Sequence, residues 1–113
     1  MDEARLPTHL EVNALIRRVG AEGGFATVLA RGERDAGTLL VVLLGRDHDS
    51  RAYERMPQLD GSRAWSLSRV EDPADPFAFA DYLDRRKAQD PDIWIVELDV
   101  RDGERFIDGA EHS

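Results

Sequence analysis

Carboxylates are the only abundant side chains in this sequence that could carry chemistry. Glu97 and Asp99 stand two residues apart, so in a strand both side chains point to the same face of the sheet. Glu54 could approach them from another strand. Three carboxylates that converge can hold Mg²⁺ and support hydrolysis of a phosphate ester. The sequence therefore allows a metal-assisted hydrolase that uses these three acids.

The pattern around the acids argues against such an enzyme. A nuclease of the PD-(D/E)xK kind needs a lysine two residues beyond its second acid, and Asp99 occupies that position after Glu97. Acids at the solvated end of a strand produce the same pattern without any site. We therefore expect no catalytic residue, no bound metal and no cofactor, and we keep the hydrolase as the alternative interpretation.

Other segments resemble sites only in part. The triplet 47–49, Asp-His-Asp, contains metal-ligand types, but successive side chains diverge, so we expect a turn. The glycine-rich segment 20–24 follows a predicted helix, whereas a phosphate-binding loop precedes one. The serines have no G-x-S-x-G context. Because the chain has no Cys, it can form neither a thiolate zinc site nor a disulfide.

Charge and apolar content exclude further classes. The 23 acidic and 15 basic residues give a formal net charge of −8, which argues against binding to nucleic acid or to anionic lipid. The longest apolar run has six residues, too few to span a membrane. The acidic N-terminal segment has no apolar core of a signal peptide, so we expect a cytoplasmic protein.

The predicted elements are organised around the apolar run 39–44, which lies between Gly37 and Gly45. Side chains of a strand alternate between the two faces of a sheet. A strand without any polar position must therefore be covered on both faces. We expect this run to be the central strand of a sheet with helices packed against it.

Two segments have the features of helices. Residues 8–21 carry apolar side chains at spacings i, i+3, i+4 and i+7. This helix is predicted to begin with a capping box formed by Thr8 and Glu11. The second helix, residues 76–89, is predicted to follow Asp75 as its N-cap, with proline at the first helical position.

Five segments have the alternation or the apolar content of strands. They are residues 25–31, 38–44, 51–56, 63–70 and 93–100. Glycines in the loop 32–37 favour a hairpin between the first two strands, and Asp60-Gly61 favours a turn between the third and fourth. Short connections predict an antiparallel meander of these four strands. The fifth strand arrives through a helix and can lie parallel to a neighbour beside the central strand.

These elements together predict an α+β fold, with about five mostly antiparallel strands and two packed helices in the order α-β-β-β-β-α-β. We expect one compact domain over residues 1–100, followed by a polar tail over residues 101–113. Trp65 and Trp94 are expected in the core or in an interface rather than as stacking platforms for a ligand.

Four segments together resemble a small alpha-proteobacterial family of unknown function, number 1491. The segments are RLPTHLEVNALIRRV, GGFATVLARG, YERMPQLDG and DPDIWIVELD, and the resemblance spans residues 5–99. It implies a compact domain of helices packed on a sheet. It implies no assigned activity and no functional residue.

The missing catalytic pattern favours a non-catalytic binding or protein-interaction module over an enzyme. The strand 93–100 carries apolar residues on both faces, and two helices need not cover both faces of a sheet completely. An uncovered apolar face would bind an unknown protein partner or a second copy of the chain, so a homodimer is one expected assembly. Nucleic acid and membranes are not expected partners.

Overall fold

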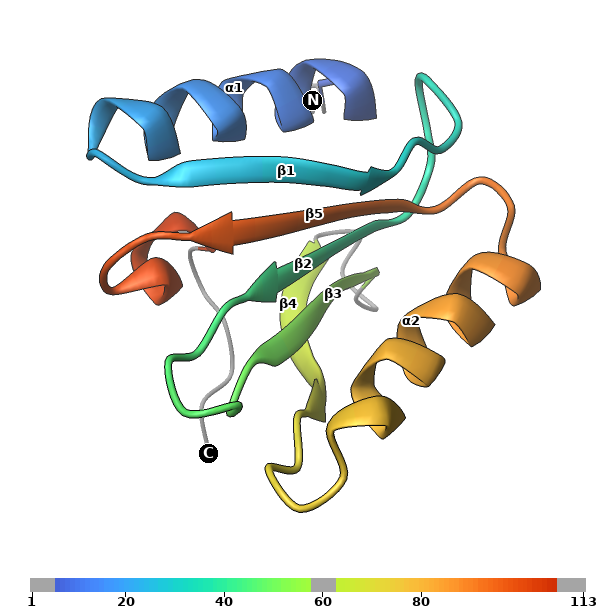
Figure 1. Ribbon diagram of the computed structural model, residues 1–113. Coiled ribbons are helices and arrows are strands. Elements are labelled where there is room, and N and C mark those ends of the chain that lie inside the picture. The colour runs from blue at the N-terminus through green and yellow to red at the C-terminus, as the bar shows by residue number, and fades with distance from the viewer. Residues whose placement is uncertain (1–5, 58–62, 108–113) are drawn as a thin grey trace.

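The computed structural model describes residues 6–57 and 63–107 of the chain. Its elements are α1 (Thr8–Ala21), β1 (Phe25–Ala30), β2 (Leu39–Leu43), β3 (Arg51–Pro57), β4 (Arg63–Val70), α2 (Pro76–Gln89), β5 (Trp94–Asp99) and the short 3-10 helix η1 (Gly103–Phe106) (Figure 1). The structure confirms the α+β class and the order α-β-β-β-β-α-β. No helix in the described part of the chain is long and apolar enough to cross a membrane.

Five strands form one sheet in the order β1-β5-β2-β3-β4. Strands β2 and β5 run parallel, and the other three neighbouring pairs are antiparallel. The parallel arrangement beside the central strand is as predicted. The predicted β1–β2 hairpin is wrong, because β5 lies between these two strands and pairs with both.

The loop between β1 and β2 packs against the start of β5 instead of forming a tight hairpin. The Glu33 amide donates to the Asp92 carbonyl at 2.9 Å, and the Trp94 amide donates to the Thr38 carbonyl at 2.8 Å. A Cβ atom at Gly32 would lie 2.5 Å from the Ile93 carbonyl carbon. Gly32 is therefore needed because the backbones of the loop and of residues 92–93 approach closely, and not because the chain makes a hairpin turn there.

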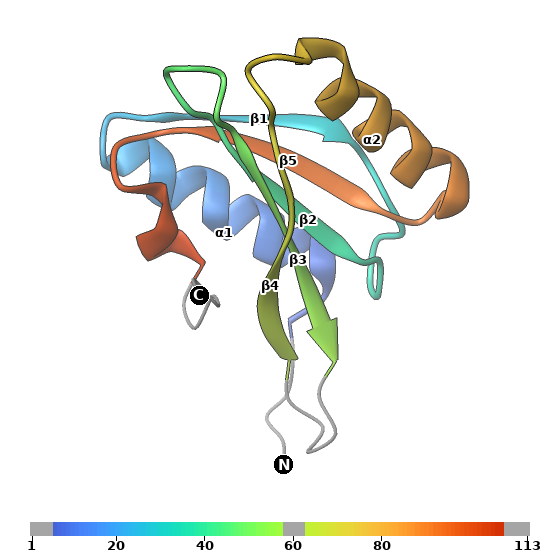
Figure 2. The same cartoon turned by 90° about the horizontal axis from the view of Figure 1, so that it is seen from below.

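Strand β2 is buried along its whole length. Its side chains alternate between two apolar clusters, one with residues of α1 and the other with Phe79 of α2. The first cluster takes Leu39, Val41 and Leu43, and the second takes Leu40 and Val42. The two helices lie on opposite sides of β5 and β2 in Figure 2. The prediction that the apolar run is covered on both faces is confirmed for residues 39–43, whereas Leu44, at the end of the run, is exposed.

The start of α1 differs from the predicted capping box. The Thr8 hydroxyl, which is buried, donates to the Gly37 carbonyl at 3.0 Å and forms no cap hydrogen bond. Glu11 accepts two hydrogen bonds from Arg55 at 2.6 and 2.7 Å. Asp75 likewise makes no side-chain cap at α2. At α1, partners distant in sequence have replaced the local bonds that the motif predicts.

Strand β3 connects both helices to the sheet through two adjacent residues. Glu54 and Arg55 point to opposite faces, because neighbouring side chains in a strand alternate. Arg55 pairs with Glu11 of α1, and Glu54 pairs with Arg86 of α2. The hydrogen bond with Glu54 also raises the pKa of Arg86. Each pair is largely shielded from water, so loss of one partner would leave a poorly solvated charge.

The C-terminal segment differs from the expected polar tail. Phe106 is 7% exposed and Ile107 is 1% exposed, and both belong to the cluster beneath α1. A Cβ at Gly103 would lie 2.9 Å from a methyl group of Leu43, so η1 packs tightly against β2. The packed structure therefore continues past residue 100 to residue 107. The remainder of the predicted tail, 108–113, and the predicted Asp60-Gly61 turn lie outside the described residues.

The contact between Gly32 and β5 predicts different effects for two glycine substitutions. Gly32→Ala should lower the free energy of unfolding by about 1–3 kcal/mol, because the added methyl group overlaps the backbone at residues 92–93. Gly20→Ala is the control: it lies in α1 with open space around the Cβ position, and alanine there should stabilise the protein by up to about 1 kcal/mol. Urea unfolding measures both. A Gly32→Ala protein as stable as the wild type would contradict this packing.

Candidate functional site

The three predicted carboxylates do not converge. In the strand register Glu54 lies beside Leu40, whereas Glu97 lies beside Val42 on the far side of β2. With strands about 4.8 Å apart and about 3.3 Å per residue, these two acids are separated by roughly 12 Å. Glu54 is also engaged with Arg86. Within residues 6–57 and 63–107, no group of three His, Asp, Glu or Cys residues could hold a metal ion.

The other singled-out segments have the structures that their simpler interpretations predict. Residues 46–48 form a turn and a bend, with His48 at a positive φ of 58°. Residues 20–24 end α1 and turn the chain into β1, with Gly23 at a φ of 85°. Trp94 is 3% exposed, and its indole nitrogen donates to the Glu33 carbonyl at 2.7 Å. Trp65 is half-buried against the same apolar cluster.

One face of the sheet is only partly covered. Helix α2 packs over β2, β3 and the beginning of β5, through the cluster that contains Phe79. Figures 1 and 2 both show α2 away from the start of β1 and the end of β5. The side chains that remain on this part of the face are Phe25, Thr27, Glu97 and Asp99. We call these four residues the open face.

The open face combines apolar and acidic side chains. Phe25 is 72% exposed. Phe25 pairs with Asp99 in the register, and Thr27 pairs with Glu97. The alternate residues of β1, Ala26 and Val28, face the α1 side of the sheet and pack against the core there. Strand alternation therefore holds Phe25 and both acids on the same uncovered surface.

Glu97 is the residue of the open face whose pKa is shifted. Partial burial raises the pKa of its carboxyl group, and the neighbouring Asp99 charge raises that pKa further. Its cross-strand neighbours, Thr27 and Val42, carry no charge. The carboxylate therefore lies beside a like charge in partly desolvated surroundings, with no cation among the causes of its shift.

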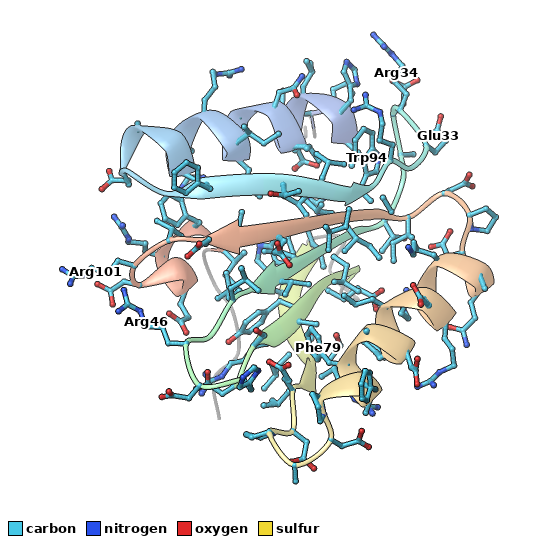
Figure 3. All side chains as sticks on the ribbon, in the orientation of Figure 1. Glu33, Arg34, Arg46, Phe79, Trp94 and Arg101 are labelled. Atoms are coloured by element: carbon cyan, nitrogen blue, oxygen red, sulfur yellow. The ribbon has the colours of Figure 1, made fainter. Side chains whose placement is uncertain are left out.

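Two adjoining hollows border the open face, where the parallel strands β2 and β5 both end. Their volumes are about 410 and 240 Å³, and both are lined by Arg46, Asp99 and Arg101. Phe25 also lines the smaller hollow. Figure 3 shows Arg46 and Arg101 close together at this end of the molecule. Among the residues described, neither arginine is in an ion pair with a carboxylate.

The family model for a protein of unknown function (DUF1491) matches residues 6–108 of this chain. The chain belongs to the DUF1491 family. This finding confirms the resemblance that the four sequence segments carry, and the match continues to residue 108, beyond the predicted domain boundary.

Solved structures of DUF1491 proteins have the same fold. A crystal structure of a DUF1491 family protein from Caulobacter crescentus CB15 is 37% identical, with a TM-score of 0.78, over 95% of this chain and 100% of that one. An NMR structure of a DUF1491 family protein from this organism is 36% identical, with a TM-score of 0.79, over 97% and 100%. A solution structure of a protein from A. tumefaciens is 29% identical, with a TM-score of 0.73, over 92% and 93%. No curated protein matches the chain.

The raised pKa of Glu97 predicts that this DUF1491 protein gains stability when the charge is removed. A carboxyl group with a higher pKa in the folded state destabilises that state when ionised, and this cost disappears as the pH falls through the folded-state pKa. Glu97→Gln should therefore be more stable than the wild type at pH 7 to 8, by roughly 0.5 kcal/mol or less because the group is partly solvated.

Urea unfolding from pH 8 to pH 4 measures this difference, which should shrink toward pH 4 as the wild-type carboxyl becomes protonated. Glu22→Gln is the control, because Glu22 pairs with Arg105 at the surface and its neutralisation should bring no gain in stability. A Glu97→Gln protein that is less stable than the wild type at pH 7 would show that the charge of Glu97 is favourably solvated or paired.

Proposed function

We propose that this DUF1491 protein is a non-catalytic, cytoplasmic interaction module that binds a protein through the open face. The observation that carries the proposal is Phe25, a large aromatic side chain that is 72% exposed on a sheet surface. Contiguous apolar surface on a small protein is characteristic of interaction sites, and aromatic residues are enriched in the centres of interfaces. The bound protein is another chain or a second copy of this one.

The shape of β1 supports binding on the face of the sheet rather than along its edge. Strand β1 is at one edge of the sheet, and its six residues carry no charge. The register between β1 and β5 shifts between Val28 and Ala30, which is a bulge at Leu29. A bulge twists an edge and interrupts the regular row of backbone groups that an added strand would need. The exposed side chains, not the edge backbone, are therefore the binding elements.

The positions and ion pairs of the acidic residues favour a binding function over hydrolysis. Glu54 is held by Arg86 on the part of the face that α2 covers, so Glu97 and Asp99 stand without Glu54 as a third carboxylate. Two carboxylates on one strand can contribute to recognition of a partner, whereas metal-assisted hydrolysis needs a convergent ligand set.

The proposal predicts that capture of partner proteins depends on the open face. The purified protein, immobilised and exposed to lysate of its native host, should retain bound protein. The variant Phe25→Ser should retain at least about tenfold less, since truncation of a central anchor typically costs about 2 kcal/mol. Quantitative mass spectrometry of the eluates and sedimentation of the free protein measure binding to other chains and to itself.

Phe77→Ser is the matched control, because Phe77 on α2 is 78% exposed and lies outside the open face. This variant should retain wild-type binding. Equal capture by the wild type and Phe25→Ser would overturn the proposal. So would a wild-type protein that remains monomeric and captures nothing above the level of an unrelated acidic protein.

A further inference from the structure

The charge of the open face indicates what kind of partner fits it. The chain as a whole has a net charge of −8, and the open face carries two acids and no base. The neighbours of Glu97 across the strands are uncharged, and the only nearby charge that affects its pKa is that of Asp99. Arg46 and Arg101 lie beyond Asp99, in the hollows at the ends of the strands. A basic side chain of a partner protein would therefore form an ion pair with Glu97.

A second copy of the chain is a poor occupant for the same reason. Two open faces packed against each other would bring the acids of one copy close to the acids of the other. Like charges brought together in an interface disfavour a complex, whereas complementary charges speed association and select the partner. The open face is thus suited to a partner that combines apolar groups with positive charge.

We propose that the open face docks an extended, basic segment of another protein, with an apolar side chain against Phe25 and an arginine or lysine at Glu97. The inference rests on the proposed function, because it specifies the partner of the same surface. It assigns no role to the hollows at the ends of the strands.

The spacing of the open face sets the pattern of such a segment. Phe25 pairs with Asp99 and Thr27 pairs with Glu97, so Glu97 lies two residues along the strands from Phe25 and one strand further into the sheet. An extended segment lying over β1 would therefore present an apolar residue against Phe25 and, two positions before or after it, a basic residue that reaches Glu97. Both side chains point to one side of an extended chain.

A set of matched peptides tests the inference by NMR titration of the isotope-labelled full chain. The peptide SLSRSLS has an apolar residue two positions from its arginine in either chain direction, SLSESLS reverses the central charge and SASRSAS removes the apolar anchors. SLSRSLS should cause saturable shifts centred on β1 and the end of β5. The other two peptides should bind at least about tenfold more weakly.

Variants of the protein separate specific docking from general attraction of a base to an acidic protein. Phe25→Ser and Glu97→Gln should each weaken binding of SLSRSLS about fivefold or more. Phe77→Ser and Asp81→Asn, both at exposed positions on α2, should leave binding unchanged. The inference is overturned if SLSESLS binds as well as SLSRSLS, if the shifts lie elsewhere, or if no saturable shift is seen at millimolar peptide.

The failure of this inference can be distinguished from failure of the proposed function. A dimer that forms with rising protein concentration and is lost in Phe25→Ser would assign the open face to a second copy, which supports the function and overturns the basic segment. Capture of lysate proteins that depends on Phe25, without binding of SLSRSLS, would likewise support the function and overturn the basic segment. Loss of both activities overturns both statements.

Discussion

Burial of β2 on both faces is the constraint on which the rest of the structure depends. Each of its residues lies in one of two apolar clusters, so the sheet must carry a helix on either side. The parallel pairing with β5 follows from the connection, because a strand that enters through a helix can align with a strand already in place. Glu54 and Arg55 of β3 then form ion pairs with one helix on each face of the sheet. The order of the strands and the position of both helices are arranged around this one strand.

The open face is a consequence of the same arrangement. Helix α2 covers the part of its face that lies over β2 and β3, where burial is required. One helix is about 10 Å wide, whereas a sheet of five strands is about 20 Å across. The start of β1 and the end of β5 therefore lie beyond the reach of α2, and Phe25, Glu97 and Asp99 remain accessible. The surface that we assign to binding is the part of the sheet that the core does not need.

Local patterns predicted the elements well and their long-range partners poorly. The apolar run 39–44, the alternation in β5 and the stripe on α1 are set by burial, which periodicity reports directly. The capping box of Thr8 and the hairpin glycines of loop 32–37 are equally clear motifs, but tertiary contacts to Gly37 and to residues 92–93 replaced the predicted local bonds. Phe106 and Ile107 escaped prediction because two apolar residues show no period.

The same limit applies to the site. That Glu97 and Asp99 share a face follows from their spacing alone, and the structure has them so. Whether Glu54 lies near Glu97 and Asp99 depends on the register of three strands. Whether Phe25 is exposed depends on how much of the sheet α2 covers. Neither is encoded in a short segment. Exposure of one aromatic residue could be found only after β1 was placed next to β5.

The position of β5 between β1 and β2 also determines when the sheet can be completed during synthesis of the chain. The strand that completes the middle of the sheet is the last one to be synthesised, so the nascent chain holds both halves of the sheet without the piece that joins them. Until then β2 offers apolar side chains and unpaired backbone, the kind of surface that chaperones shield and that aggregates. The complete five-stranded sheet therefore cannot form before β5 has been synthesised, because β5 is the strand that joins β1 to β2.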